Sequence, residues 1–184
     1  QVRFKTAKAT DSVQIKLKSI YRGSTFNHTG FSEIQILDQS PSPFVVPSSY
    51  TASSTLPPDG ENYEATNLHD GIADSMWCEG NTDGDGKGES ITFDFGSATS
   101  VSKLQLRNGS AGSFSSFMAT NRAKSAKLTF SDGSSADVAI KTSLMPQTIS
   151  FPAKNTSKVV VTFTDVARGS QYNDLCISEA TFSK

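Results

Sequence analysis

Apolar and polar residues alternate along several segments of this chain, and that alternation leaves little choice of secondary structure. Val101, Leu104 and Leu106 are interleaved with charged and amide side chains, and a similar pattern recurs at residues 126–130 and 159–164. Because successive side chains of a β-strand point to opposite faces of a sheet, these segments are predicted to be half-buried strands. No window carries a sustained helical stripe with capping residues. Short strands separated by Gly-, Asn- and Ser-rich turns predict an all-β sandwich or jelly roll.

The chain also contains an internal repeat. Residues 1–38 align without a gap on residues 147–184, and 11 of these 38 positions are identical. The identities include an Arg-Gly-Ser turn that begins at Arg22 and again at Arg168, an Asn five residues later and a Ser-Glu pair. Self-similarity at a fixed offset indicates that one structural unit is written twice.

The repeat predicts the domain organisation. We interpret residues 1–38 as the C-terminal strands of a first, partial copy and residues 50–184 as a complete copy, with the Pro- and Ser-rich residues 39–49 as a linker. A few isolated strands leave an apolar face and open edges exposed. Residues 1–38 are therefore expected to pack against the complete domain, another copy, or a missing N-terminal part of the same protein.

Composition argues against several classes of function. The net charge is −1, and the 17 Lys and Arg residues are scattered, so nucleic acid is not an expected partner. No apolar run approaches the roughly 20 residues needed to span a bilayer. The only two histidines are His28 and His69, and no set of nucleophile, base and orienting group stands out. An enzyme is therefore not expected.

Several segments resemble a known family. The run from Tyr63 to Gly80, with its Trp-Cys-Glu-Gly ending, and the Ile-Thr-Phe-Asp-Phe-Gly segment at 91–96 resemble the start of discoidin, or coagulation factor type C, domains. The ending from Arg168 to Glu179 looks more like the branch called the NADase-type glycan-binding domain. The resemblance covers roughly residues 48–184.

This resemblance implies a discoidin-like jelly-roll β-sandwich. It also implies a non-catalytic module that binds glycan and belongs to a secreted or cell-surface protein. Two other functions are compatible with it: a protein or phospholipid adhesion domain, and an accessory domain of a secreted enzyme such as an NAD glycohydrolase.

In discoidin-like domains, Asp70, Ser75 and Glu179 correspond to a structural calcium site. Calcium prefers hard oxygen ligands, and a tight Asp-Gly turn can direct carbonyl groups toward one cation. In the alternative, Asp70 only closes an Asx turn and Glu179 is a surface residue of the last strand. The segment 81–86 begins like an EF-hand loop, but Thr92 replaces the bidentate glutamate at its twelfth position, which favours a flexible Gly-rich turn.

Cys78 and Cys176 are the only cysteines in the chain. The resemblance implies that they pair in a disulfide, as an even number of cysteines in a secreted module suggests. The alternative is two buried free thiols that pack as small apolar groups. Trp77 is expected to be a core residue rather than a sugar platform.

Loops 81–88, 110–120 and 167–174 are expected to meet at one end of the sandwich and to carry the ligand. Sugar recognition combines aromatic faces with planar polar groups, and these loops and their flanks offer both. At least one of the two phenylalanines of the second loop is expected to anchor it, and the repeated Arg and Asn could instead be a turn signature. The candidate ligand-binding residues are Phe114, Phe117, Asn121, Arg122, Arg168, Tyr172 and Asn173, with Asn108 beside them.

Overall fold

A computed structural model describes residues 15–19, 24 and 44–184. The chain divides into two units, residues 1–42 and residues 43–184. In the first unit, residues 15–19 contain no helix or strand, although Ile15 and Leu17 match strand positions of the repeat. The remainder of the prediction for residues 1–38 lies outside the described residues. The second unit contains every helix and strand of the described part.

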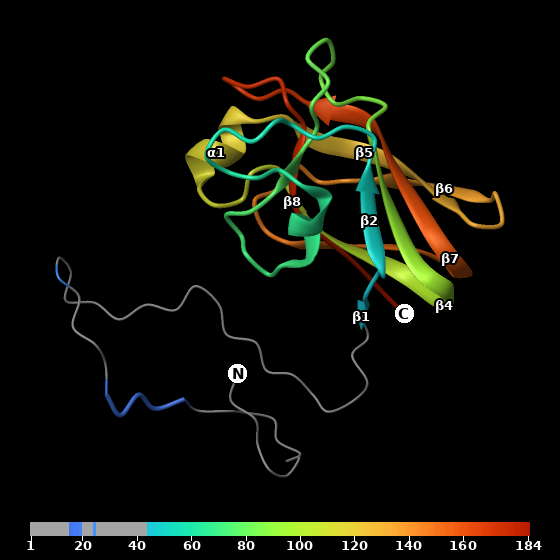
Figure 1. Cartoon of the computed structure of the whole chain (residues 1–184). Coiled ribbons are helices and arrows are strands. Elements are labelled where there is room, and N and C mark those ends of the chain that lie inside the picture. The colour runs from blue at the N-terminus through green and yellow to red at the C-terminus, as the bar shows by residue number, and fades with distance from the viewer. Residues whose placement is uncertain (1–14, 20–23, 25–43) are drawn as a thin grey trace. The chain divides into compact units, whose positions relative to one another are not determined.

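That second unit is almost entirely β-structure (Figure 1), which confirms the predicted fold class. The three longest strands, β4, β7 and β5, contain the three segments whose alternation predicted strands. Two short helical segments, η1 and α1, interrupt the strands. The elements are β1 (Phe44–Val45), β2 (Ser49–Ala52), η1 (Ala65–His69), β3 (Trp77–Cys78), β4 (Ser90–Asn108), α1 (Phe114–Ala119), β5 (Arg122–Phe130), β6 (Ser135–Ala139), β7 (Gln147–Ala167) and β8 (Cys176–Ser183).

The antiparallel pair of β4 with β7 organises the sandwich. Ser90 pairs with Thr162 near one end of the ladder, and Leu106 pairs with Gln147 near the other. The register shifts between Asp94 and Thr99, where both strands fold over. One half of the pair adjoins β2 and β5, with β6 beyond β5, and the other half adjoins β8. Because each strand folds over at its middle, both of its ends lie at the same end of the sandwich.

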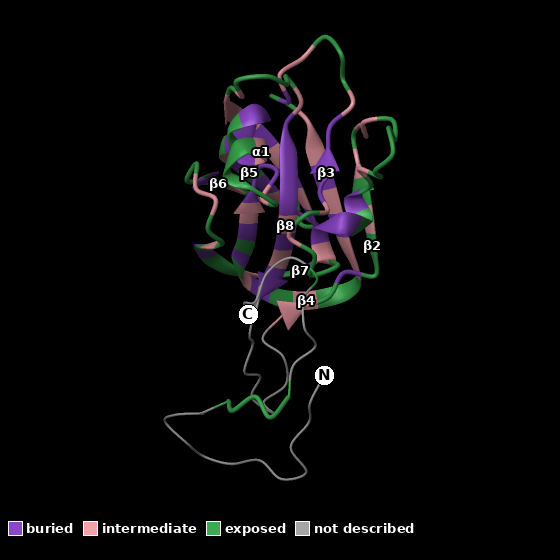
Figure 2. Ribbon diagram, turned by 90° about the vertical axis from the view of Figure 1, so that its left-hand side faces the viewer, coloured by how far each residue is buried: buried purple, intermediate pink, exposed green. Residues whose placement is uncertain are grey.

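The core lies between the two layers that this folded pair creates. Strand β8 is buried along most of its length (Figure 2), as expected for a strand covered on both sides. Trp77 is fully buried, stacks on Phe163 with ring centroids 5.9 Å apart, and donates its indole N–H to the Ser54 carbonyl at 3.0 Å. The expectation that Trp77 is a core residue is therefore confirmed.

The start of the folded domain differs from the expected boundary at residue 50. Phe44 pairs with Ser183 and Val45 with Phe182. Strand β1 therefore lies beside β8 and belongs to the sheet, although it falls in the segment interpreted as a linker. Pro47 follows the strand closely and has no N–H to donate to a ladder. The Pro-rich composition predicted a connector without strands. A strand at the edge of a sheet, such as β1, needs few backbone N–H donors, so a Pro-rich segment can still form one.

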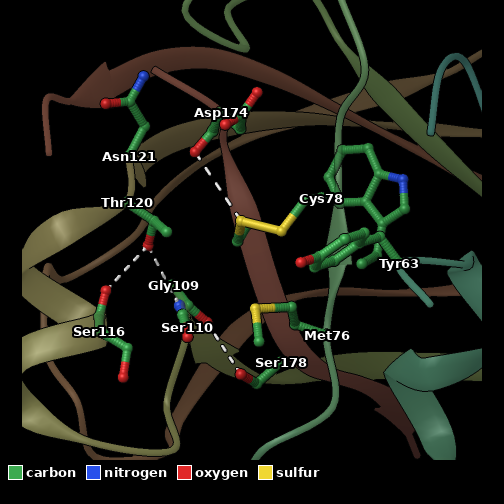
Figure 3. The surroundings of a disulfide bond; sticks show 12 residues. Tyr63, Met76, Cys78, Gly109, Ser110, Ser116, Thr120, Asn121, Asp174 and Ser178 are labelled. Atoms are coloured by element: carbon green, nitrogen blue, oxygen red, sulfur yellow. Dashed lines mark hydrogen bonds between the residues drawn. A yellow bond between two sulfur atoms is a disulfide. The ribbon is translucent and has the colours of Figure 1, made fainter. Parts of the chain in front are cut away.

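The disulfide between Cys78 and Cys176 is present (Figure 3) and joins directly opposite positions of β3 and β8. The two Cα atoms lie 4.1 Å apart, and 98 residues separate the cysteines in sequence. Met76, Leu56 and Tyr63 pack around the bond. The pairing that the resemblance implied is confirmed, and it ties the loop after β3 to the loop before β8.

Loss of this disulfide should destabilise the domain strongly. Closing a loop of about 100 residues restricts the unfolded chain, so the chain-entropy model gives roughly 4–5 kcal/mol, and removal of native disulfides typically costs about 2–5 kcal/mol. Denaturant unfolding of the wild type with and without reductant measures this effect. The double variant Cys78→Ser, Cys176→Ser serves as the control and should no longer respond to reductant. An unchanged wild-type midpoint after complete reduction would contradict the prediction.

Candidate functional site

Three loops meet at one end of the sandwich, as the sequence predicted, and the side chain of Asn121 joins them. Its Nδ2 donates to the carbonyls of Asp85 and Asn173 at 3.0 and 2.6 Å, and its Oδ1 accepts from the N–H of Gly169 at 2.7 Å. The Asn121 backbone N–H donates to the Asp174 carbonyl at 3.0 Å. The amide is fully buried. Asn121 therefore holds the loops in place, and its predicted contact with a ligand is corrected.

Arg122 and Phe117 have a similar supporting role. Both are buried, and the Arg122 guanidinium lies 5.2 Å from the Phe117 ring centroid. Arg122 Nη1 donates to the Phe117 carbonyl and Nη2 to the Arg168 carbonyl, each at 2.8 Å. Phe117 is thus the phenylalanine that anchors its loop. Neither side chain is available to a ligand on the surface, because packing and backbone hydrogen bonds use them.

Asn108, named beside the ligand candidates, is also a structural residue. It is fully buried at the end of β4. Its amide donates to the carbonyls of Ala123 and Lys141 at 2.7 and 3.0 Å and accepts from the Ala123 N–H at 2.9 Å. Sequence alone did not distinguish these buried amides from surface amides that could bind sugar.

The helix α1 was not predicted, because six residues are too few to show a helical period. Ser113 caps it by accepting from the Ser116 N–H at 3.0 Å. Phe114 and Met118, one turn apart on the helix, are 69% and 41% exposed. The serine before Phe114 was the available sequence signal, since Ser is a preferred N-cap residue.

The loop between β7 and β8 docks on the C-terminal end of α1. The N–H groups of Ser170 and Tyr172 donate to the carbonyls of Met118 and Ala119, both at 2.9 Å. A Cβ on Gly169 would lie 2.1 Å from the Ala119 carbonyl oxygen, so this close approach requires glycine. The glycine of the motif at 168–170 therefore has a structural role, because it permits this close backbone approach.

The docked loop and α1 together present an exposed surface, which we call the α1 patch: Phe114, Met118, Arg168 and Tyr172. Tyr172 is 51% exposed and Arg168 is exposed as well. Met118 lies in the predicted ligand loop 110–120, although it was not among the individual candidate residues. Asn173 borders the patch but donates its Nδ2 to the Gly84 carbonyl, so its amide is partly engaged in holding the loops.

Glu79 lies directly after β3 and is fully buried. Its Oε2 accepts from the Asn81 N–H at 2.7 Å, at the base of the loop before β4. Burial raises the pKa of the Glu79 carboxyl above its ordinary value, hydrogen bonds from Asn81 and Leu175 partly offset this, and the charges of Glu89 and Asp174 raise it further. Sequence analysis gave this residue no role.

Of the predicted calcium residues, Asp70 and Ser75 lie in the loop after η1 and Glu179 lies on β8. The Asp70 carboxylate accepts from the Ile72 N–H at 2.8 Å and from the Ser75 hydroxyl at 2.7 Å, which is an Asx turn with a serine added. Glu179 is on β8 opposite Arg107. No three acidic, histidine or cysteine side chains gather as a metal site within the described residues. Asp70 and Ser75 suit calcium as hard oxygen donors, and the ion stays a prediction.

The loop that begins like an EF-hand is built from similar turns. Asn81 Oδ1 accepts from the Asp83 N–H and Asp85 Oδ1 from the Lys87 N–H, both at 3.2 Å. These side chains shape the loop locally, as expected for a Gly-rich turn.

Replacing Glu79 with Gln should stabilise the domain at neutral pH. Because the folded-state pKa is raised, the folded chain holds the proton more tightly, so stability is fully present below the ordinary pKa of 4.5 and is lost as pH rises through the folded pKa. Gln keeps an oxygen for Asn81 and has no charge to bury. We expect the melting temperature of Glu79→Gln to exceed that of the wild type at pH 7 and the difference to shrink toward pH 4. A difference that is constant with pH would contradict this account.

If calcium binds at Asp70, chelation should lower the melting temperature of the wild type by a few degrees, since an ion bound only to the folded state stabilises it. Asp70→Asn keeps the acceptor of the Asx turn and removes the charge, so its melting temperature should not respond to chelator. Asp132→Asn is the matched control, because Asp132 Oδ1 forms an equivalent turn with Ser134 at 2.8 Å. A wild type that does not respond to chelator would exclude calcium.

The fold is similar to that of several solved carbohydrate-binding modules. A CBM32 module from Clostridium perfringens, solved with GalNAc-β-1,3-galactose, is 16% identical with a TM-score of 0.54 and aligns over 74% of this chain and 94% of its own. The CBM32 module of AlyQ, solved with 4,5-unsaturated mannuronic acid, is 22% identical with a TM-score of 0.52, over 76% of this chain and 96% of its own.

A chitosan-binding module from a Paenibacillus chitosanase/glucanase is 21% identical with a TM-score of 0.52, over 76% of this chain and 97% of its own. At these identities the similarity shows the fold. A search of curated proteins finds no match. Residues 44–183, the range that contains all strands described above, match a family model. The chain belongs to the family of NAD glycohydrolase translocation F5/8 type C domains.

Proposed function

We propose that residues 43–184 form a non-catalytic glycan-binding module of an extracellular or cell-surface protein, with the α1 patch as its ligand surface. The observation that carries this proposal is the pair of exposed aromatic rings, Phe114 on α1 and Tyr172 on the loop that is hydrogen-bonded to this helix. An aromatic face can pack on the apolar face of a sugar ring, while planar polar groups such as the Arg168 guanidinium can bond neighbouring hydroxyls.

Other observations support the proposal. Carbohydrate-binding modules solved with bound sugars share this fold. The Cys78–Cys176 disulfide suits an oxidising compartment such as the cell exterior. None of the described helices has the length and apolar character of a membrane span.

A second function, as the accessory domain of a secreted enzyme such as an NAD glycohydrolase, is favoured by the family match. The two proposals are compatible, since a glycan-binding module can direct an attached enzyme to its target. Within the folded domain, His69 is engaged with the Thr181 hydroxyl at 3.1 Å and stacks on Tyr50, which favours a structural role for this histidine.

A glycan array should identify ligands, and the double variant Phe114→Ala, Tyr172→Ala should weaken binding to each of them. Loss of two stacking rings predicts roughly a tenfold or larger rise in Kd. Because both rings are exposed, the melting temperature should change little. The measurement is titration calorimetry of wild type and variant with the array hits.

Val46→Ala is the matched control. Val46 is 62% exposed, and it lies near the fold-over of β4 at the end opposite the α1 patch, since Ser48 donates to the Asp94 carbonyl at 2.7 Å. This variant should bind like the wild type. Full retention of binding in the double variant would overturn the assignment of the surface, and binding to anionic liposomes with no array hit would favour the adhesion function instead.

A further inference from the structure

The Arg168 guanidinium is the accessible cation of the α1 patch. Among the described residues, this guanidinium has no hydrogen bond or ion pair. The peptide group between Arg168 and Gly169, in contrast, is held by hydrogen bonds at both its C=O and its N–H. The Arg168 carbonyl accepts from Arg122 Nη2 at 2.8 Å, and the next N–H, of Gly169, donates to Asn121 Oδ1 at 2.7 Å. A side chain on such a base loses less freedom when it binds a ligand.

A second guanidinium, that of Arg122, donates to the Arg168 backbone and has no carboxylate partner within the described residues. Arg122 is nine-tenths buried, and none of the ion pairs of the described part includes it. Its acceptors are the carbonyls of Phe117 and Arg168, and its Nε has no hydrogen-bond partner within the described residues. A buried charge without a counter-ion is unfavourable, so an anion bound close by would offset part of that cost.

The same hydrogen bonds join the two segments that carry Arg168 and the exposed aromatic rings. The Arg122 guanidinium bridges the carbonyl of Phe117 in α1 and that of Arg168 in the loop between β7 and β8. Phe114 begins the same helix and Tyr172 belongs to the same loop. A ligand that covers the patch therefore meets aromatic faces and a free planar fork of N–H donors, which matches the geometry of a carboxylate.

Nearby acids limit what kind of anion fits. Asp83 and Asp85 come from the neighbouring loop that Asn121 ties to this one, and Asp174 follows Tyr172 and Asn173 directly. Their negative charges repel a densely charged chain more than they repel one carboxylate in direct contact with Arg168. The attraction between that carboxylate and Arg168 acts at short range, whereas salt screens the repulsion from the more distant acids.

We propose that the α1 patch selects sugars that carry a carboxylate, the uronic acids, and that Arg168 is the residue that determines this specificity. The proposal rests on the glycan-binding function proposed above and names its ligand class. A heavily sulfated glycan is not the expected ligand.

The test compares each uronate with its own neutral counterpart. Oligomannuronate, oligoguluronate and oligogalacturonate are titrated into the full chain beside their carboxyl-reduced forms, which keep the linkage and length and lose the charge. Wild type should bind at least one uronate about tenfold or more tightly than its reduced form, as expected for a hydrogen-bonded charge pair.

Arg168→Gln should remove this preference, so that the uronate and its reduced form bind to the variant with similar Kd values. Lys158→Gln is the matched control, because Lys158 is an exposed cation on β7, opposite Asp94 in the ladder and at the end of the sandwich away from the α1 patch. It should keep the preference. The melting temperature of both variants should equal that of the wild type.

The outcomes separate the two proposals. If reduced sugars bind as tightly as uronates, if Arg168→Gln keeps the preference, or if heparin oligosaccharides bind more tightly than every uronate, the specificity inference is overturned while glycan binding stands. If no glycan of either kind binds, in this panel or on the array, the proposed function itself fails.

Discussion

The folding over of the β4–β7 pair is the constraint on which the rest of this structure depends. An ordinary antiparallel pair sends the ends of its two strands to opposite ends of a sheet. Here each strand reverses near the register shift after Asp94, so both ends of β4 and both ends of β7 reach one end of the sandwich. The loops that follow Asn108 and Ala167 are neighbours for this reason, although 59 residues of sequence separate them.

Given that convergence, one buried amide organises the loops. Asn121 uses its side-chain donors and acceptor on three backbone groups of two other loops, so its hydrogen-bonding capacity is spent inside the protein. Arg122 does the same for α1 and the loop after β7. These contacts leave the side chains of Phe114, Arg168 and Tyr172 outside while their backbones are fixed, and that division separates the residues that support the surface from those that form it.

The sequence supported the fold more fully than the site, and the reason is physical. Strand alternation reports which face of a sheet is buried, so Leu104, Leu128 and Val161 were correctly expected inside. The Arg-Gly-Ser motif at 168–170 has a structural reason, because only glycine at 169 allows the close approach to the Ala119 carbonyl. Whether Phe114 or Phe117 enters the core depends on where Arg122 lies, and that contact is tertiary. No pattern within the segment separates the two rings.

Buried polar residues were the main source of error for the same reason. Asn and Arg are usually exposed, and composition therefore favoured Asn108, Asn121 and Arg122 as ligand contacts. These side chains are buried because they donate to loop carbonyls that would otherwise lack a hydrogen-bond partner. Which carbonyls need a donor depends on the three-dimensional arrangement of the loops. Disulfide pairing, in contrast, was implied by family resemblance and needed no geometry.

Strand β1 has a consequence for how such a module can be tethered. Phe44 pairs with Ser183, so the chain enters and leaves the fold side by side. Strand β8 starts at the loop end with Cys176 and spans about 25 Å at the usual rise per residue before it reaches that exit. Polypeptide joined before β1 or after β8 would therefore attach at the pole facing away from the α1 patch. The attachment points of the folded domain and its proposed ligand surface would thus lie at separate poles.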